Sequence, residues 1–89
     1  MKLEDEATAT AIRRLRRAEG QVAGVIRMLE GGRECQDIVT QLAAASRALD
    51  KAGFQIIASG LRQCLADPEQ NPEQMSTQED LERLFMSLA

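Results

Sequence analysis

The sequence predicts an all-α protein. Each protomer is expected to hold three helices, an antiparallel dimer to form a four-helix bundle, and two dimers to form a tetramer. Helix-forming residues dominate, and apolar residues recur at steps of three and four rather than two. In addition, the longest predicted helix is too long for a compact monomer of 89 residues. The whole chain, residues 1–89, is expected to be a single domain.

The first predicted helix spans about residues 5–29. Its apolar stripe consists of Ile12, Leu15, Ala18, Val22, Val25 or Ile26, and Leu29. Steps of three and four place these side chains on one face of the helix. Gly31 and Gly32 follow directly and are expected to end the helix in a left-handed turn.

The second predicted helix spans about residues 34–65, and proline 68 ends it. Its apolar seam follows a heptad pattern and consists of Cys35, Ile38, Leu42, Ala45, Leu49, Ala52 and Ile56. At ~1.5 Å per residue this helix is about 48 Å long, whereas a compact domain of this size has a radius of gyration of ~12 Å. A second chain must therefore cover the seam, which predicts a homo-oligomer.

A polar linker is expected over residues 66–75, followed by a third helix over about 76–88. Ser76 or Thr77 is the predicted N-cap, with an acidic residue three positions later. The apolar face of this helix is formed by Leu81, Leu84, Phe85 and Leu88.

Composition excludes several classes of protein. No apolar run approaches the ~18 residues of a membrane span, and the acidic first ten residues are unlike a secretory signal, so we expect a cytoplasmic protein without a membrane partner. The chain has no His, and so lacks both the usual general base and the commonest metal ligand. It has no phosphate-binding loop either, and we predict that it is not an enzyme.

Charge is segregated along the chain. The net charge is −3, but residues 1–65 carry ten Lys or Arg against eight Asp or Glu, and residues 66–89 carry one Arg against six acids. The densest basic run contains Arg13, Arg14, Arg16 and Arg17. Such a run is by itself more typical of a solvated helix face, but it also suits the phosphates of nucleic acid.

The two cysteines, Cys35 and Cys64, are 29 residues apart on the second helix and share its face. They are separated by about 43 Å along the axis, whereas a disulfide needs Cα atoms within ~7 Å. An antiparallel partner helix would bring Cys35 beside Cys64, in a register that also pairs Leu42 with Ile57. The first turn of a helix favours an anion, so Cys35 is the expected attacking thiol and Cys64 the resolving one. Alternatively, both are simply buried apolar residues.

The segment from Ile12 to Glu30, together with Cys35 and residues 41–44 (QLAA), resembles the CsoR/RcnR family of bacterial transcriptional repressors. The resemblance implies all-helical dimers that form tetramers, bind double-stranded operator DNA without a helix-turn-helix, and release it when a cysteine-centred site is loaded. It also assigns Arg14 and Lys51 to the DNA surface, which Arg47 would extend by one turn. Gln21 matches a further family position.

Branches of the family differ at this cysteine-centred site. The copper-sensing branch has a histidine where this chain has Gly60 and a cysteine at the position of Cys64, whereas the nickel and cobalt branch uses several histidines. The formaldehyde-sensing branch has proline where this chain has Lys2 and lacks the second cysteine. The persulfide-sensing CstR branch keeps both cysteines without the histidine, and this chain resembles it most.

The resemblance therefore implies a repressor that senses reactive sulfur through an intersubunit Cys35–Cys64 pair and needs no cofactor. Two alternatives remain open at this stage. One is a Cu(I)-responsive repressor that binds the metal through the same two thiolates. The other is a helical interaction module without a role on DNA.

Overall fold

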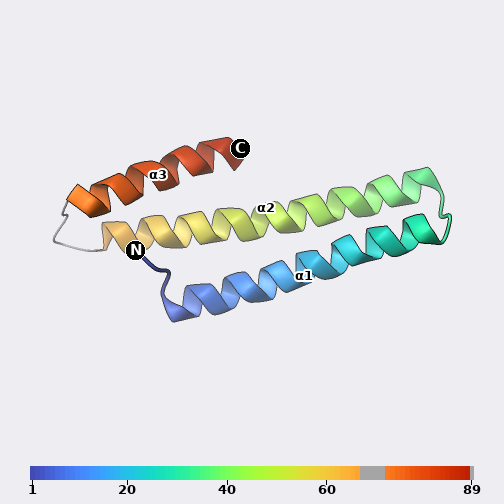
Figure 1. The fold of residues 1–89 in the computed structure, drawn as a ribbon, viewed down its shortest axis with the longest axis horizontal. Coiled ribbons are helices and arrows are strands. Elements are labelled where there is room, and N and C mark those ends of the chain that lie inside the picture. The colour runs from blue at the N-terminus through green and yellow to red at the C-terminus, as the bar shows by residue number, and fades with distance from the viewer. Residues whose placement is uncertain (67–71, 89) are drawn as a thin grey trace.

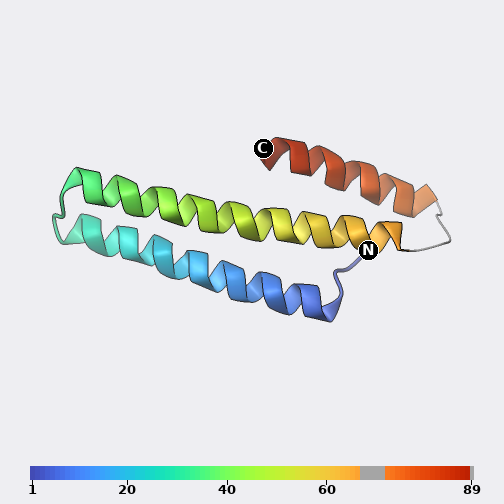
Figure 2. The ribbon, with the colours of Figure 1, turned by 180° about the vertical axis from the view of Figure 1, so that it is seen from behind.

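The computed structural model describes residues 1–66 and 72–88 and contains three helices, α1 (Asp5–Glu30), α2 (Cys35–Leu65) and α3 (Pro72–Leu88). Helices α1 and α2 form an antiparallel hairpin, and α3 runs back along the second half of α2 on the side away from α1 (Figure 1). The reverse view in Figure 2 shows the same order of helices. The protomer is long and flat, measuring 56 × 24 × 13 Å. The predicted all-α, three-helix protomer is confirmed.

The turn between α1 and α2 depends on Gly32. Gly31 keeps a helical backbone, whereas Gly32 has a φ of +67°, a conformation that side chains with a Cβ adopt only with strain. Its neighbour closes the turn, because the Arg33 N–H donates to the Met28 carbonyl at 3.0 Å. The left-handed turn predicted for this glycine pair is thus made by the second glycine.

Small residues line the contact between α1 and α2. Helix α1 buries Ala11, Ala18 and Val25, and the middle of α2 buries Ala45 and Ala52, while Ile57, Gly60 and Cys64 are buried further along α2. The four alanines form two pairs at heptad spacing, and their small side chains let two helix backbones approach closely. The larger members of the predicted stripe of α1, such as Ile12 and Leu15, therefore do not face α2.

The larger aliphatic side chains of the hairpin remain exposed in the protomer. Leu42 and Leu49, both members of the predicted seam of α2, are 52% and 53% exposed. The remaining exposed aliphatic residues of the hairpin are Ile12, Leu15, Val22, Ile26, Leu29, Val39 and Leu65. Fully burying one such side chain contributes ~1.5–3 kcal/mol, so the hairpin offers a second chain a substantial apolar surface.

Helix α3 begins at Pro72, about four residues before the start predicted at Ser76 or Thr77. Proline suits a first helical position because its fixed φ matches the helix and its missing N–H would have no partner there. The predicted linker over 66–75 is therefore wrong for residues 72–75, while residues 67–71 lie outside the described part of the chain.

Helix α3 packs on α2 through its apolar face. Phe85 contacts Phe54 with ring centroids 5.3 Å apart. Two glycines of α2 leave room for leucines of α3: a Cβ at Gly53 would lie 3.2 Å from Leu88, and one at Gly60 would lie 3.1 Å from Leu81. Among the helical residues described, no helix is both long and apolar enough to cross a membrane.

Candidate functional site

A basic groove lies between α1 and α2. It has a volume of about 360 Å³ and is lined by Arg14, Arg17, Gln21, Ala44, Arg47, Ala48 and Lys51. Four of these seven side chains are cationic, and the two alanines are small and leave space between them. Four of the six basic residues that the sequence nominated for DNA thus converge from two helices.

The other two nominated cations, Arg13 and Arg16, are exposed on α1 outside this groove. Arg13 donates to the Thr10 hydroxyl at 3.5 Å. Within the described residues, the ion pairs join Arg33 to Asp37 and Arg83 to Asp80. No carboxylate of residues 1–66 and 77–88 therefore pairs with the four groove cations, which leaves their charge available to an anion.

Gln21 adds a polar group to the basic groove. Its Oε1 atom is buried and accepts no hydrogen bond from any described residue. A buried carbonyl oxygen without a donor is costly, so the groove presents an acceptor as well as cations.

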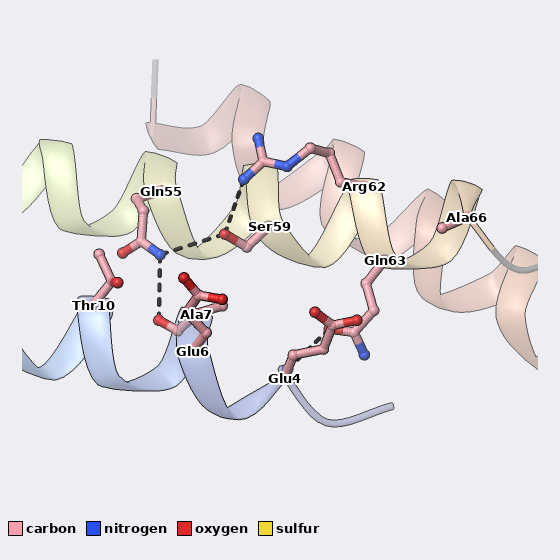
Figure 3. Close-up of a pocket in the computed structure, with 9 residues that line it drawn as sticks. All are labelled: Glu4, Glu6, Ala7, Thr10, Gln55, Ser59, Arg62, Gln63 and Ala66. Carbon is pink, nitrogen blue, oxygen red and sulfur yellow. Dashed lines mark hydrogen bonds between the residues drawn. The ribbon is translucent and has the colours of Figure 1, made fainter.

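A second, larger cavity of about 440 Å³ lies between the start of α1 and the end of α2 (Figure 3). Its lining includes Glu4 and Glu6 but only one cation, Arg62, so its charge opposes phosphate binding. Gln55 crosses it and donates to the Ala7 carbonyl at 3.3 Å, which ties α2 to α1. The hydrogen bond across the cavity links the two helices of the hairpin, and the acidic lining makes the cavity a poor site for nucleic acid.

Cys35 and Cys64 lie at opposite ends of α2 and differ in their exposure to solvent. Cys35 is the first residue of α2 and is exposed, next to an exposed Arg33–Asp37 pair of 3.6 Å. Cys64 is at the other end of the helix and only 2% exposed. Because α2 is unbroken between them, about 43 Å of helix keeps the two thiols of one protomer apart.

The buried Cys64 thiol is covered by the amino-terminal residue. Its Sγ atom lies 3.4 Å from the Sδ atom of Met1. The methyl carbon of Met1 would lie 3.6 Å from a Cβ at Gly60, so this side chain occupies space that the glycine leaves free. Met1 was not among the residues that sequence reasoning selected, because nothing local links it to residues about 60 positions away.

Gln63 holds the amino-terminal segment in this place. Its Nε2 donates to the Lys2 carbonyl at 2.6 Å, and its Oε1 accepts from the Glu4 N–H at 3.0 Å. Figure 3 shows the second of these bonds between the end of α2 and the start of α1. One glutamine thus binds the backbone on both sides of residue 3, and sequence reasoning missed this residue too.

Comparison with known proteins supports a regulatory role. A model of the metal-sensitive transcriptional repressor family matches residues 7–88. The chain is 40% identical over 53 residues to the copper-sensing transcriptional repressor RicR of Mycobacterium tuberculosis. It is 37% identical over 54 residues to the copper-sensing transcriptional repressor CsoR of Bacillus subtilis. These matches cover 60% and 61% of this chain but span only 55% and 54% of the two relatives.

A solved structure resembles the whole protomer. It is a single-residue variant of the formaldehyde-responsive regulator FrmR from Salmonella enterica serovar Typhimurium. The TM-score is 0.82 at 26% identity, and the match covers 97% of this chain and 98% of that chain. The family consists of transcriptional repressors rather than enzymes, in agreement with the sequence prediction. The chain belongs to the metal-sensitive transcriptional repressor family, the CsoR/RcnR family.

Proposed function

We propose that the protein is an operator-binding repressor that releases DNA when reactive sulfur modifies its two cysteines. One observation carries the sulfur part of this proposal: Cys35 is exposed and Cys64 buried, at opposite ends of one unbroken helix. A sulfur donor from solution meets Cys35 first. Cys64 can react afterwards with a Cys35 that a second protomer delivers.

The proposed antiparallel dimer provides that second protomer. In an antiparallel pair of α2 helices, aligning Cys35 with Cys64 of the partner subunit also places Leu42 opposite Ile57 and centres the two-fold axis near Leu49. Leu42 and Leu49 are exposed in the protomer, so this register would bring both into the dimer contact, whereas Ile57 is already buried within its own protomer. The same dimer forms the four-helix bundle, and two dimers form the tetramer.

We expect the protein to be at least dimeric, and tetrameric when fully assembled, at micromolar concentration. The physical reason is the row of exposed aliphatic side chains, which a monomer would leave in water. Sedimentation equilibrium measures the mass directly. Leu49→Asp places charges beside the proposed axis and should weaken the dimer. Thr40→Asp, at an exposed position on the opposite side of α2 from Leu42, should not. A folded wild-type monomer of 9.8 kDa would contradict the proposed assembly.

The basic groove is the proposed DNA surface, with Arg14, Arg17, Arg47 and Lys51 at its centre. Arg13 and Arg16 extend it along the exposed face of α1. Symmetry repeats the groove in every protomer, so a tetramer offers several clusters of cations to one duplex. Binding through such clusters is strongly dependent on salt, because each neutralised phosphate releases counterions.

The proposed chemistry starts at the Cys35 thiolate. A persulfide RSSH transfers its outer sulfur to Cys35, so that a new sulfur–sulfur bond forms there and the donor leaves as the thiol RSH. Cys64 of the partner subunit then attacks the Cys35 sulfur and expels hydrosulfide, which leaves a disulfide. Two thiols are oxidised and the transferred sulfur is reduced. If Cys35 first accepts two sulfur atoms, attack on the inner of the two leaves a trisulfide.

Cu(I) binding is the second candidate function. Two copper-sensing relatives and the pairing of a cysteine with a methionine sulfur at the end of α2 favour it. Thiolate and thioether sulfur are ligands that select Cu(I). This chain has Gly60 where the copper-sensing branch has a histidine ligand, which argues against a site of the copper-sensing type. Sulfur chemistry therefore remains the first proposal.

A comparison of the two inducers separates these functions. Reduced protein bound to fluorescent operator DNA is treated anaerobically with organic polysulfide in one sample and with chelator-buffered Cu(I) in another. We expect polysulfide to release the DNA and a later addition of dithiothreitol to restore binding, since thiols reduce the link. Release by Cu(I) at one ion per protomer, with no response to polysulfide, would favour the second function instead.

A further inference from the structure

We propose that Met1 and Cys64 of one protomer form a soft-metal site, in which the thioether and the thiolate bind the same Cu(I) ion. This inference rests on the second candidate function and not on the sulfur chemistry. It assigns a ligand, Met1, that takes the place of the histidine this chain lacks.

The two sulfur atoms are close enough to share an ion after Met1 moves away from Cys64 by about half an ångström, since two bonds of about 2.3 Å at ~120° separate the sulfurs by about 4.0 Å. They are 3.4 Å apart, and both belong to residues whose side chains carry no other donor. If each sulfur binds the ion at about 2.3 Å, the bond length of a thiolate to Zn²⁺, the separation of 3.4 Å corresponds to an angle of about 95° at the metal. The three rotatable bonds of methionine allow Met1 to open this angle without moving α2.

The surroundings favour a metal ion that prefers sulfur. Cys64 is 2% exposed, whereas Met1 is 52% exposed, so an ion can reach the buried thiol past the methionine side chain. Gly60 lies beneath Met1 and Leu81 of α3 covers the same glycine, which makes the immediate neighbourhood apolar. Such a site offers sulfur rather than the carboxylate and carbonyl oxygens that Mg²⁺ and Ca²⁺ require.

Two hydrogen bonds from Gln63 hold the backbone next to Met1 in place. Gln63 is the residue before Cys64, and its amide binds the backbone of Lys2 and of Glu4. This double contact brings the amino-terminal segment back over the end of α2, where Figures 1 and 2 show the chain beginning. In an antiparallel dimer the partner's Cys35 would approach the same place and could add a third sulfur.

The test uses full-length protein labelled with selenomethionine and loaded with Cu(I) under anaerobic conditions. X-ray absorption at the copper edge then reports whether selenium is bound to copper. We expect a copper–selenium signal in the wild type and in Met86→Leu, which removes an exposed methionine of α3. Met1→Leu, released from a cleavable fusion so that position 1 need not encode the start, should lose the signal. Intact mass confirms the residue at position 1.

Affinity gives a second readout. In competition with a chromophoric chelator, Met1→Leu should bind Cu(I) at least tenfold more weakly than Met86→Leu. The signal should persist in Cys35→Ala, because the proposed pair lies within one protomer, and should disappear in Cys64→Ala. Absence of selenium from the wild-type copper environment, its persistence in Met1→Leu or its loss in Cys35→Ala would overturn the proposal. None of these results depends on DNA or polysulfide, so failure here leaves the sulfur proposal untouched.

Discussion

Cys35→Ala is expected to abolish both the covalent link between protomers and the loss of DNA affinity caused by polysulfide. The substitution removes the exposed nucleophile, and the remaining thiol, Cys64, is buried. Operator affinity before treatment should stay within about threefold of the wild type, because Cys35 lies at the hairpin end of α2, away from the groove cations Arg47 and Lys51. Fluorescence anisotropy on operator DNA with and without polysulfide measures the effect.

Cys64→Ala serves as the matched variant. Cys35 should still accept sulfur, so its mass should rise, but the Cys35–Cys64 link cannot form. Non-reducing electrophoresis and intact mass tell these two states apart. A Cys35→Ala protein that still releases DNA fully on polysulfide treatment would contradict the role of Cys35.

The second large effect is expected in the basic groove. Arg14→Ala and Lys51→Ala should each weaken operator binding by roughly tenfold or more, because symmetry removes the same cation from every groove on the DNA. Each lost phosphate contact should also reduce the slope of log affinity against log salt by about one unit. Both residues are exposed, so the thermal unfolding midpoint should change little.

Arg83→Ala tests whether the loss of any positive charge, rather than of a groove cation, weakens DNA binding. This exposed arginine lies on α3 and pairs with Asp80, away from the groove. Its removal changes the net charge by the same amount but should leave the salt slope intact. Equal effects of Arg83→Ala and Arg14→Ala, or unchanged binding in both Arg14→Ala and Lys51→Ala, would contradict the assigned surface.

Local patterns in the sequence were enough to predict the helices themselves. Apolar spacing gave α1 and α2 their extents, and Gly32 provides the left-handed residue of the turn between them. The start of α3 was predicted too late, because Pro72, which was assigned to the polar linker, is the first residue of the helix. Periodicity indicates which face is apolar, but not which part of it meets the same chain. Alanines such as Ala45 and Ala52 fill the hairpin contact, while leucines remain outside.

The candidate site was predictable only in part. The sequence nominated both cysteines and the cations of the groove, since charge and residue type are visible there. The sequence alone does not show which of these arginines line the groove. Arg14 and Arg17 do so, and Arg13 and Arg16 do not, because of where α2 packs against α1. Contacts between distant segments were invisible as well. The position of Met1 on Cys64 depends on how α1 returns along α2 and on the side chain of Gln63.

Peptide mass spectrometry of the polysulfide-treated protein, digested without reduction, tests the central claim most directly. Mixing unlabelled and nitrogen-15-labelled protein before treatment distinguishes a link between chains from one within a chain. The account predicts a Cys35–Cys64 peptide pair, joined by two or more sulfur atoms, in which labelled and unlabelled halves are mixed. A pair found only within chains of one label, or full release of DNA with both cysteines unmodified, would contradict it.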